Sequence, residues 1–214
     1  MKDIAVFGAG GFGREVASII NIINKKEKRW NFVGFFDDGV RKGTQISHHG
    51  TVLGGMSELN NWSTPLDLAI AIGNPASLKG VRERIVNGHI EFPNIIYPDF
   101  NMYDVSTIKL GIGNIINRGC SCTCDIIIGN FNVFNGNITL GHDDIVGNFN
   151  VIMPSVCVSG EVRIGDCNLI GVGSIILQQI KIGNNVRLGA GAVLLTKPKD
   201  GNTYIGNPAK VFKY

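Results

Sequence analysis

The chain has 214 residues, 44% of them hydrophobic and 17% charged, with a formal net charge of +3 at pH 7. This composition fits one or two globular domains with real cores and excludes a disordered chain. No stretch approaches the roughly 20 apolar residues of a membrane span, and no signal-peptide pattern opens the chain, so we expect a cytoplasmic protein.

The first part of the chain, residues 1–92, alternates strand-like and helix-like segments. The predicted elements are strands at 4–7, 31–36 and 66–72 and helices at 15–23 and 76–87. The one basic run, residues 25–29, lies where the first helix would end, which favours a solvated helix face over a nucleic-acid patch. This order predicts a small α/β domain with a parallel sheet.

A glycine-rich segment, Gly8-Ala9-Gly10-Gly11-Phe12-Gly13, directly follows the first predicted strand and opens the first helix. Asp37 and Asp38 follow the second strand. Glycines let the backbone approach a phosphate, a helix N-terminus favours the anion, and an acid can bind a ribose hydroxyl or a base. About 90 residues is small for a full dinucleotide domain, so we expect half a site, suited to one nucleotide diphosphate. The alternative is a tight turn that only packs helix on sheet.

Beyond Pro93 and Pro98 the pattern changes, and residues 93–214 form the second predicted domain. Every sixth position is apolar: Leu110, Ile116, Cys122, Ile128, Phe134, Leu140, Val146, Ile152, Val158, Ile164, Ile170, Ile176, Ile182, Leu188 and Leu194. A helix needs a period of 3.6 residues and a strand a period of two, so six fits neither. The period predicts a solenoid of triangular coils, three hexads to a coil, with these residues stacked inward.

Small residues punctuate the coils. The residue after an inward position is often glycine, and we expect the chain to turn tightly there, where a Cβ would clash. Cys120, Cys122 and Cys124 have single-residue spacing, so strand alternation sends Cys122 to one side and its neighbours to the other. That arrangement favours core-filling residues over a metal cage, and we predict no metal site.

His142 is the only histidine of the coils, and it lies two residues after an inward position. Its side chain is therefore expected at a corner or on an outer surface, and the simplest alternative is an ordinary surface histidine. Acyl transfer from a thioester to an amine or hydroxyl needs a base near neutral pH, a role that suits imidazole. Asp143 or Asp144 could fix its tautomer and stabilise the imidazolium.

Gly160 lies eighteen residues, and so one coil, after His142. Its unshielded backbone N–H could donate to a thioester carbonyl as negative charge develops, or it could simply be a corner glycine. Val172 and Ala190 are also eighteen residues apart, so they stack on each other in neighbouring coils, on a different face. Small residues there would let a pantetheine arm run along the coils.

Taken together, the motifs resemble the sialic acid O-acetyltransferase and UDP-4-amino-sugar N-acetyltransferase family of bacterial surface-glycan biosynthesis. They are the glycine segment continued by Arg14-Glu15-Val16, Phe35-Phe36-Asp37-Asp38, Ala71-Ile72-Gly73-Asn74, Gly141-His142-Asp143 and Ile205-Gly206-Asn207-Pro208-Ala209-Lys210. The resemblance implies a Rossmann-like N-terminal domain that binds a nucleotide-linked sugar, and a C-terminal left-handed parallel β-helix that binds acetyl-CoA. It also implies a homotrimer with active sites between subunits.

The resemblance assigns roles residue by residue. His142 matches the catalytic base and Asp143 the acid that orients it, while Gly160, Val172 and Ala190 match acetyl-CoA-binding positions. The positions that match the nucleotide-sugar pocket are Gly10, Gly11, Phe12, Asp37, Asp38, Gly73 and Asn74. Phe12 stands where the family often has histidine, and Val151 where many members carry a second histidine nine residues after the base.

The resulting hypothesis is acetyl-CoA-dependent N-acetylation of an amino group on a nucleotide-linked sugar, with His142 as general base. O-acetylation of sialic acid or a similar hydroxyl acceptor is the nearest alternative. A β-helix carbonic anhydrase needs three histidine ligands on zinc, and the solenoid supplies one. A nicotinamide oxidoreductase would leave the solenoid without a role, and a noncatalytic nucleotide sensor would need no acetyl-CoA.

Overall fold

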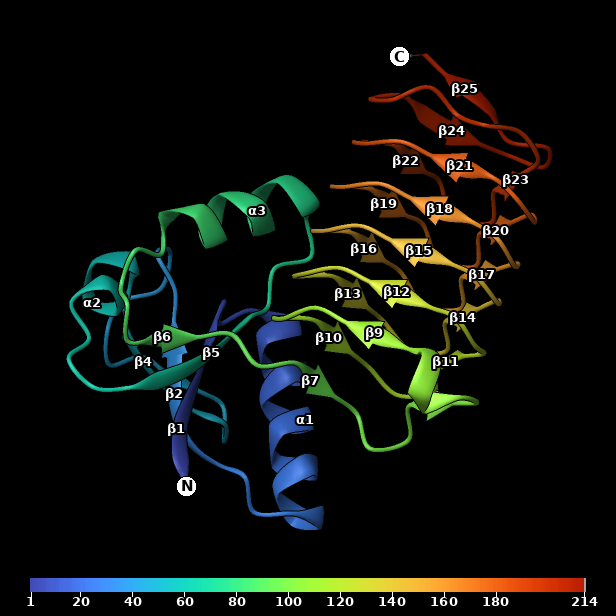
Figure 1. Ribbon diagram of the computed structural model, residues 1–214. Coiled ribbons are helices and arrows are strands. Elements are labelled where there is room, and N and C mark those ends of the chain that lie inside the picture. Colours follow the sequence, from blue (N-terminus) through green and yellow to red (C-terminus); the bar gives the residue numbers. More distant parts are fainter. Residues whose placement is uncertain (214) are drawn as a thin grey trace.

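The computed structural model describes residues 1–213; Tyr214, the last residue of the second predicted domain, lies outside the described residues. The chain forms an α/β unit followed by a three-sided stack of coils (Figure 1). Among the described residues, no helix combines the length and the apolar character needed to cross a membrane.

The α/β unit is a six-stranded sheet in the order β3-β4-β2-β1-β5-β6. Its elements are β1 (Lys2–Phe7), α1 (Gly11–Lys26), β2 (Trp30–Phe36), β3 (Gln45–Ile46), β4 (Gly50–Gly54), α2 (Met56–Asn60), β5 (Leu66–Ile70), α3 (Pro75–Arg84) and β6 (Ile90–Glu91). The predicted strands and helices are confirmed, although α3 ends three residues before the predicted residue 87. Only β3 runs antiparallel to its neighbour, and the central strands are parallel as predicted.

The solenoid places every predicted inward residue second in a two-residue strand. The strands are β7 (Ile95–Ile96), β8 (Asn101–Met102), β9 (Lys109–Leu110), β10 (Ile115–Ile116), β11 (Ser121–Cys122), β12 (Ile127–Ile128), β13 (Val133–Phe134), β14 (Thr139–Leu140), β15 (Ile145–Val146), β16 (Val151–Ile152), β17 (Cys157–Val158), β18 (Arg163–Ile164), β19 (Leu169–Ile170), β20 (Ile175–Ile176), β21 (Lys181–Ile182), β22 (Arg187–Leu188), β23 (Val193–Leu194), β24 (Thr203–Ile205) and β25 (Lys210–Phe212). A 3-10 turn, Val105–Thr107, lies between β8 and β9.

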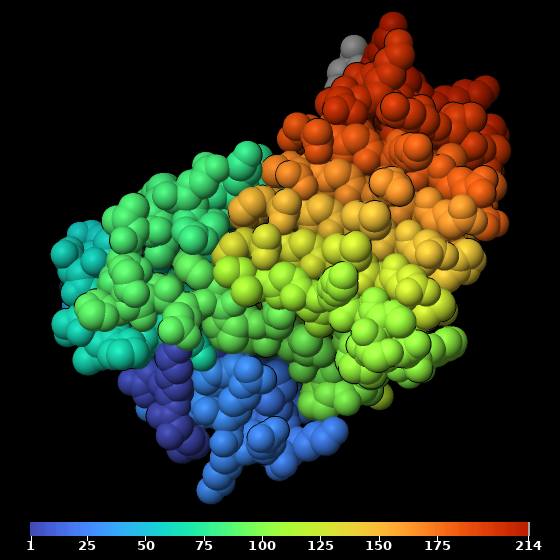
Figure 2. Space-filling model, in the orientation of Figure 1, coloured from blue at the N-terminus to red at the C-terminus, as the bar shows by residue number. Residues whose placement is uncertain are grey.

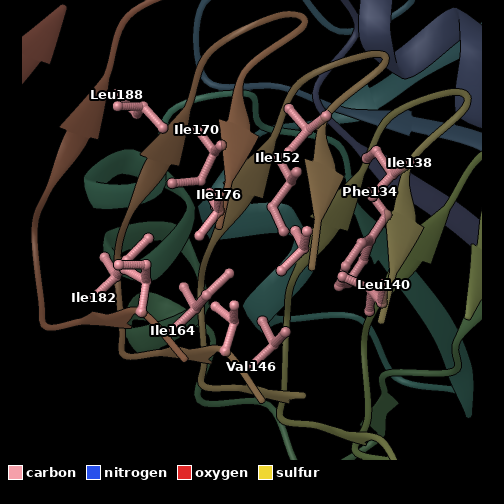
Figure 3. Close-up of a cluster of buried hydrophobic side chains, with 14 of the residues drawn as sticks. Phe134, Ile138, Leu140, Val146, Ile152, Ile164, Ile170, Ile176, Ile182 and Leu188 are labelled. Carbon is pink, nitrogen blue, oxygen red and sulfur yellow. The ribbon is translucent and has the colours of Figure 1, made fainter. Parts of the chain in front are cut away.

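From β9 to β23, parallel pairing joins each strand to the one three along the chain, as in Ile127 with Ile145, so one coil spans 18 residues as predicted. The last coil is shorter, because β22 pairs with β24 and Arg187 lies beside Thr203. The inward residues form one apolar core, in which only Leu110 of the predicted series is half-buried rather than buried. Figure 3 shows these side chains converging from the three faces into the interior of the prism. Burial at every sixth residue is therefore what stabilises the coils against one another.

The tight turns lie elsewhere than predicted. Left-handed φ values occur three residues after the inward residue, as at Asn137 and Asp143, and not at the glycines that directly follow it. Those glycines allow coils to stack closely: a Cβ on Gly129 would lie 2.5 Å from the carbonyl oxygen of Gly147 in the next coil. The expected clash is real, but its cause is the neighbouring coil and not the turn.

A second repeating position, which we call the column position, lies four residues after each inward residue. At one corner it holds a buried ladder of Asn114, Asn132, Asn150 and Asn168. Each Oδ1 accepts a bond from the backbone N–H eighteen residues later, as Asn132 does from Asn150. Each Nδ2 donates to the carbonyl fifteen residues later, as Asn132 does to Gly147 at 2.8 Å. The ladder thus satisfies buried polar groups across the stack.

The two parts of the chain pack through one face of the solenoid, formed by β10, β13 and β16. Val133 and Val151 are buried in the same apolar cluster as residues of β1 and β5. Phe131 packs edge-on against Phe92, 5.2 Å between ring centroids, and stacks on Phe149. Figure 2 shows the two surfaces in continuous contact. Val151 therefore fills this interface, and a histidine there would be buried between apolar side chains.

Candidate functional site

A histidine–carboxylate pair lies at the corner between β14 and β15. His142 Nδ1 is 2.8 Å from Asp143 Oδ2, and about half of each side chain is exposed. Asp143 adopts φ 61°, which turns its carboxylate back toward the imidazole. The hydrogen bond to Asp143 raises the pKa of His142. An N–H on Nδ1 that donates to this carboxylate leaves the Nε2 lone pair available, so the pair can accept a proton from a bound group.

Gly160 lies directly against this imidazole, one coil further along. A Cβ on Gly160 would stand 2.5 Å from Nε2 and 2.7 Å from Cε1 of His142. The ring therefore needs a glycine at this position, and the backbone of Glu161 donates to the His142 carbonyl at 2.7 Å. The structure brings together the residues predicted as base and amide donor.

The second candidate acid, Asp144, does not contact the imidazole nitrogens. Its side chain is buried, and Oδ1 accepts a bond from the Val162 backbone N–H at 2.8 Å. Burial raises the pKa of Asp144 to about 7. Of the two acids that the sequence left open, Asp143 is the one hydrogen-bonded to His142.

A groove of about 630 Å³ adjoins the pair and is lined by Asp143, Glu161, Arg163, Gln179 and Lys181. Glu161 accepts bonds from the side-chain amides of both glutamines of the next coil, at 2.9 and 3.1 Å. The sequence did not predict this lining. Its only signal was the pair Arg163 and Lys181, which precede inward residues and therefore point outward in register.

Val172 and Ala190 lie on another edge of the prism, after the strands of the β16–β19–β22 face. Val172 is exposed, and the Gly191 N–H donates to its carbonyl at 2.8 Å. A Cβ on Gly171 would stand 2.6 Å from the Ala190 nitrogen, so the chain passes close to itself here. Within one chain these residues are separated from His142 by the width of the sheet that contains β14, β17, β20 and β23.

The glycine segment is partly packed and partly open. Gly8 adopts φ 110°, and a Cβ on Gly13 would overlap the Gly8 carbonyl, so these two glycines pack the turn against α1. At Gly10, Gly11 and Gly73, in contrast, a Cβ would meet no other group within 4 Å. These three backbone positions are the ones that a ligand can approach.

The predicted acids are held by the protein backbone. Asp37 accepts bonds from the Ala9 and Gly39 N–H groups, both at 2.8 Å. Asp38 accepts from the Met56 N–H at 2.7 Å and pairs with Arg84 at 2.8 Å. The bond from Met56, together with Arg84, lowers the pKa of Asp38. Both carboxylates therefore order the loops beside the open glycines.

The two remaining predicted pocket residues have different surroundings. Phe12 is half-buried and packs against the apolar clusters on both faces of the sheet. Asn74 caps α3 by accepting from the Ser77 N–H at 3.0 Å, and it lines a cleft of about 330 Å³ shared with Cys167 and Arg187 of the solenoid. Since β1, β2 and β5 are neighbours in the sheet, the loops that carry Gly10, Asp37 and Gly73 meet at its carboxyl edge.

The His142–Asp143 pair and this loop cluster do not face each other within one chain. The α/β unit packs on the face formed by β10, β13 and β16, and the His142 corner joins the other two faces, on the edge opposite to it (Figure 1). One chain alone therefore presents the two candidate sites on different sides of the molecule.

Cys120 and Cys122 fill space in the core, though not by simple alternation. Cys120 and Cys122 are both buried, because the strand contains only residues 121–122 and Cys120 occupies a column position. Burial raises the pKa of each of these thiols to about 11. Within residues 1–213, no three histidine, cysteine or acidic side chains lie close enough to share a metal ion.

Two family models match the chain: that of the PglD N-terminal domain at residues 3–88, and that of the bacterial transferase hexapeptide (six repeats) at residues 161–196. No curated protein matches it. These matches divide the chain into the same two kinds of structure that the periodicity predicts.

Among solved structures, the acetyltransferase domain of PglB from Neisseria gonorrhoeae FA1090 superposes with a TM-score of 0.88 at 28% identity, over 99% of this chain and 100% of that chain. WeeI from Acinetobacter baumannii AYE gives a TM-score of 0.88 at 25% identity, also over 99% and 100%. Perosamine N-acetyltransferase from Caulobacter crescentus shares the fold, with a TM-score of 0.85 at 21% identity over 100% and 98%.

These similarities confirm the predicted fold class, an α/β domain followed by a left-handed parallel β-helix. They also confirm the resemblance that the sequence motifs carried, since the chain matches the PglD N-terminal and hexapeptide-transferase models and superposes on a solved acetyltransferase domain. The chain is an acyltransferase whose residues 3–88 match the PglD N-terminal domain and whose residues 161–196 match the bacterial transferase hexapeptide.

Proposed function

We propose that this chain transfers an acetyl group from acetyl-CoA to the amino group of a nucleotide-linked amino sugar in bacterial surface-glycan biosynthesis. The observation that carries the proposal is the His142–Asp143 hydrogen bond, with the imidazole lying over Gly160. The similar PglB domain has been solved in complex with acetyl coenzyme A. The Caulobacter crescentus enzyme has been solved with CoA and GDP-perosamine, a nucleotide-linked sugar.

In the proposed reaction, His142 Nε2 accepts the proton that the amino group loses as its nitrogen attacks the thioester carbonyl. Asp143 stabilises the imidazolium through the bond to Nδ1. The Gly160 N–H donates to the carbonyl oxygen while the oxygen carries negative charge. The carbon–sulfur bond then breaks, and the imidazolium returns the proton to the departing thiolate, so that an amide and free CoA are released.

The open glycines of the α/β unit supply the proposed acceptor pocket. The backbone at Gly10 and Gly11 stands at the N-terminus of α1, where N–H groups and the helix dipole favour a diphosphate. Gly73 and Asn74 border the same sheet edge, while Asp37 and Asp38 fix the loops around it. In this proposal residues 1–92 bind the nucleotide-sugar, and residues 93–214 bind acetyl-CoA through Gly160, Val172 and Ala190.

A homotrimer would bring these separated sites together, and we propose that assembly. The sheet between the His142 edge and the Val172 edge carries exposed aliphatic side chains at Val172, Ile175 and Leu177. Packing such a strip against another copy removes apolar area from water and sets the edges of neighbouring chains side by side. The cofactor would then lie between two chains, with His142 from one and Val172 and Ala190 from the other.

O-acetylation of a sugar hydroxyl is the second candidate, because the same pair of residues could deprotonate either acceptor. Many members of the resembled family carry a second histidine at the position of Val151. Here Val151 is buried in the interface between the domains, so position 151 offers no second imidazole to an amine or a hydroxyl acceptor. Product analysis by NMR separates an amide from an ester.

The test is thiol release from acetyl-CoA with a panel of amino and hydroxyl sugars, free and nucleotide-linked. We expect turnover with a nucleotide-linked 4-amino sugar and loss of about 100-fold or more in kcat for His142→Ala. His89→Ala, at an exposed histidine of the α/β unit, is the matched control and should keep wild-type rates. Absence of thiol release with every acceptor, or equal rates for both variants, would contradict the proposal.

A further inference from the structure

Asp144 is a buried acid at a column position that is otherwise aliphatic. The equivalent residues in the neighbouring coils are Ile126, Val162 and Ile180, all buried. Only 1% of Asp144 is exposed, and its Oδ2 has no hydrogen-bond partner among residues 1–213. Burying a carboxylate oxygen without a hydrogen-bond donor costs free energy, whereas burying an aliphatic side chain does not. The presence of a carboxyl group at this position therefore needs an explanation.

The hydrogen bonds of the other column positions supply this explanation. Polar side chains at the column position donate to the carbonyl fifteen residues later, over 2.8 to 3.0 Å; the pairs are Asn114 with Gly129, Cys120 with Asn135, Asn132 with Gly147, Asn150 with Gly165, Asn168 with Gly183, and Ser174 with Gly189. The same geometry therefore occurs at two corners of the prism and with three kinds of donor.

Asp144 has the acceptor half of this pattern. Its Oδ1 accepts from the N–H of Val162, eighteen residues later, as the Oδ1 of Asn150 accepts from Asn168. Its Oδ2 therefore occupies the place of the asparagine Nδ2, and the carbonyl fifteen residues later belongs to Ser159. Two oxygens without a hydrogen would repel each other there, whereas a protonated Oδ2 has the one hydrogen that this bond needs.

The Ser159 carbonyl belongs to the peptide group that ends in the Gly160 N–H. Among residues 1–213, no donor is hydrogen-bonded to this carbonyl. A bond at the carbonyl polarises the peptide group and strengthens its N–H as a donor. A hydrogen bond from the buried carboxyl to this carbonyl would connect it, through one peptide group, to the amide beneath the imidazole of His142.

We propose that Asp144 is a positioning residue that works as the neutral acid: its Oδ2–H donates to the Ser159 carbonyl and holds and polarises the Ser159–Gly160 peptide for the acyl group. The catalytic consequence of this inference rests on the proposed function. The protonation state of Asp144 and its hydrogen bond are independent of that function. The role would be absent if Asp144 only filled the column as its aliphatic equivalents do.

The surroundings support a neutral acid near pH 7. Burial is the largest influence on the pKa of Asp144 and raises it, and the charge of Asp143 raises it further. The N–H groups of Val162 and Gly141 and the charge of His142 lower it. From the adjacent coils, Ile126 and Val162 face the group with aliphatic side chains, so no cation there compensates a negative charge.

The first experiment needs no acceptor. Carboxyl carbon chemical shifts of 13C-labelled full-length protein, assigned by comparison with Asp144→Asn, report the ionisation of Asp144 directly. We expect a protonated carboxyl at pH 6 and ionisation with a midpoint near pH 7. An Asp144 already ionised at pH 5 would overturn the proposal, whatever the enzyme acetylates.

The second experiment tests the catalytic consequence with two variants. Asp144→Val matches Val162 of the same column, so it should fold with an unchanged or higher melting temperature and lose about 10-fold in kcat with little change in KM. Asp144→Asn has a permanent donor in the same place and should recover most of that loss. Because ionisation of Asp144 would remove its donated hydrogen, wild-type kcat should decline at alkaline pH, and Asp144→Asn should not show this decline. Full kcat in Asp144→Val would overturn the positioning role.

Discussion

The solenoid and the α/β unit differ in how much a residue's position in the sequence determines its environment. In the solenoid, adding 18 to a residue number gives its neighbour in the next coil, and this holds for inward residues, ladder asparagines and the His142–Gly160 pair alike. In the α/β unit, the environment of Asp37 or Asp38 depends on loops that no period describes. A repeat thus makes the chemical environment of each residue predictable from its number, whereas a single-copy loop does not.

The largest expected effect tests the repeat itself, through two adjacent isoleucines of β12. Ile128 points inward and is 2% exposed, while Ile127 points outward and is 42% exposed. Ile128→Ala should lower the free energy of unfolding by about 2–5 kcal/mol, because it leaves a cavity in the stacked core. Ile127→Ala should change it by less than about 0.5 kcal/mol. Denaturant titration measures both, and equal losses would show that the period of six does not define the core.

The next effect tests the contact between coils at the His142 corner. Gly160→Ala places a methyl group where the His142 ring lies, so the imidazole must move, and we expect kcat to fall about 100-fold at nearly unchanged stability. Gly136 holds the same place in its hexad at another edge, where a Cβ would meet only the Arg118 carbonyl at 3.2 Å. Gly136→Ala should therefore keep its activity, and a similar kcat loss in both variants would argue against a specific role for Gly160.

These two sites also show what the sequence could predict. The inward series from Leu110 to Leu194 and the pairing of His142 with Gly160 follow from counting, and the hydrogen bond to Asp143 is local. The predicted roles of these residues stay predictions. The sequence misplaced the turns, because glycine after an aliphatic residue serves close stacking as well as a left-handed φ.

Other features depend on three-dimensional placement. The short elements β3, β4, α2 and β6 of the α/β unit were missed, because five residues or fewer give too little period to detect. The groove at Arg163 and Lys181 was missed because outward positions of a coil accept many residue types. That His142 and the open glycines lie on different sides of one chain depends on which face of the prism packs against the sheet, and no local pattern encodes that choice.

A third prediction compares Asp144 with the asparagine ladder through pH. The folded-state pKa of Asp144 is raised to about 7, above its value in an unfolded chain, so its favourable contribution is complete below about pH 4 and is lost as pH rises through about 7. The unfolding free energy of the wild type should therefore fall, relative to Asp144→Asn, by about 1–2 kcal/mol between pH 5 and 7. Parallel pH curves for the two proteins would contradict a raised pKa.

The smallest effect belongs to the α/β unit, where Asp38 can be either a structural or a binding residue. Asp38 accepts from the Met56 N–H and pairs with Arg84, but 43% of its side chain is exposed, so Asp38→Asn should cost less than about 1 kcal/mol at pH 7. Because the folded-state pKa of Asp38 is lowered, this contribution is present above about pH 4 and disappears as pH falls through the folded-state value.

The same variant separates the two roles of Asp38 by kinetics. If the carboxylate contacts the nucleotide-sugar, Asp38→Asn raises KM for the acceptor several-fold and leaves KM for acetyl-CoA unchanged. If it only orders the loop, both KM values stay near wild type and only the small stability change remains. Glu83→Gln, which removes an exposed pair with Lys79 at 3.9 Å, is the matched control and should alter neither quantity. An increase in the acetyl-CoA KM alone would place Asp38 at the other substrate and contradict the proposed division of labour between the two domains.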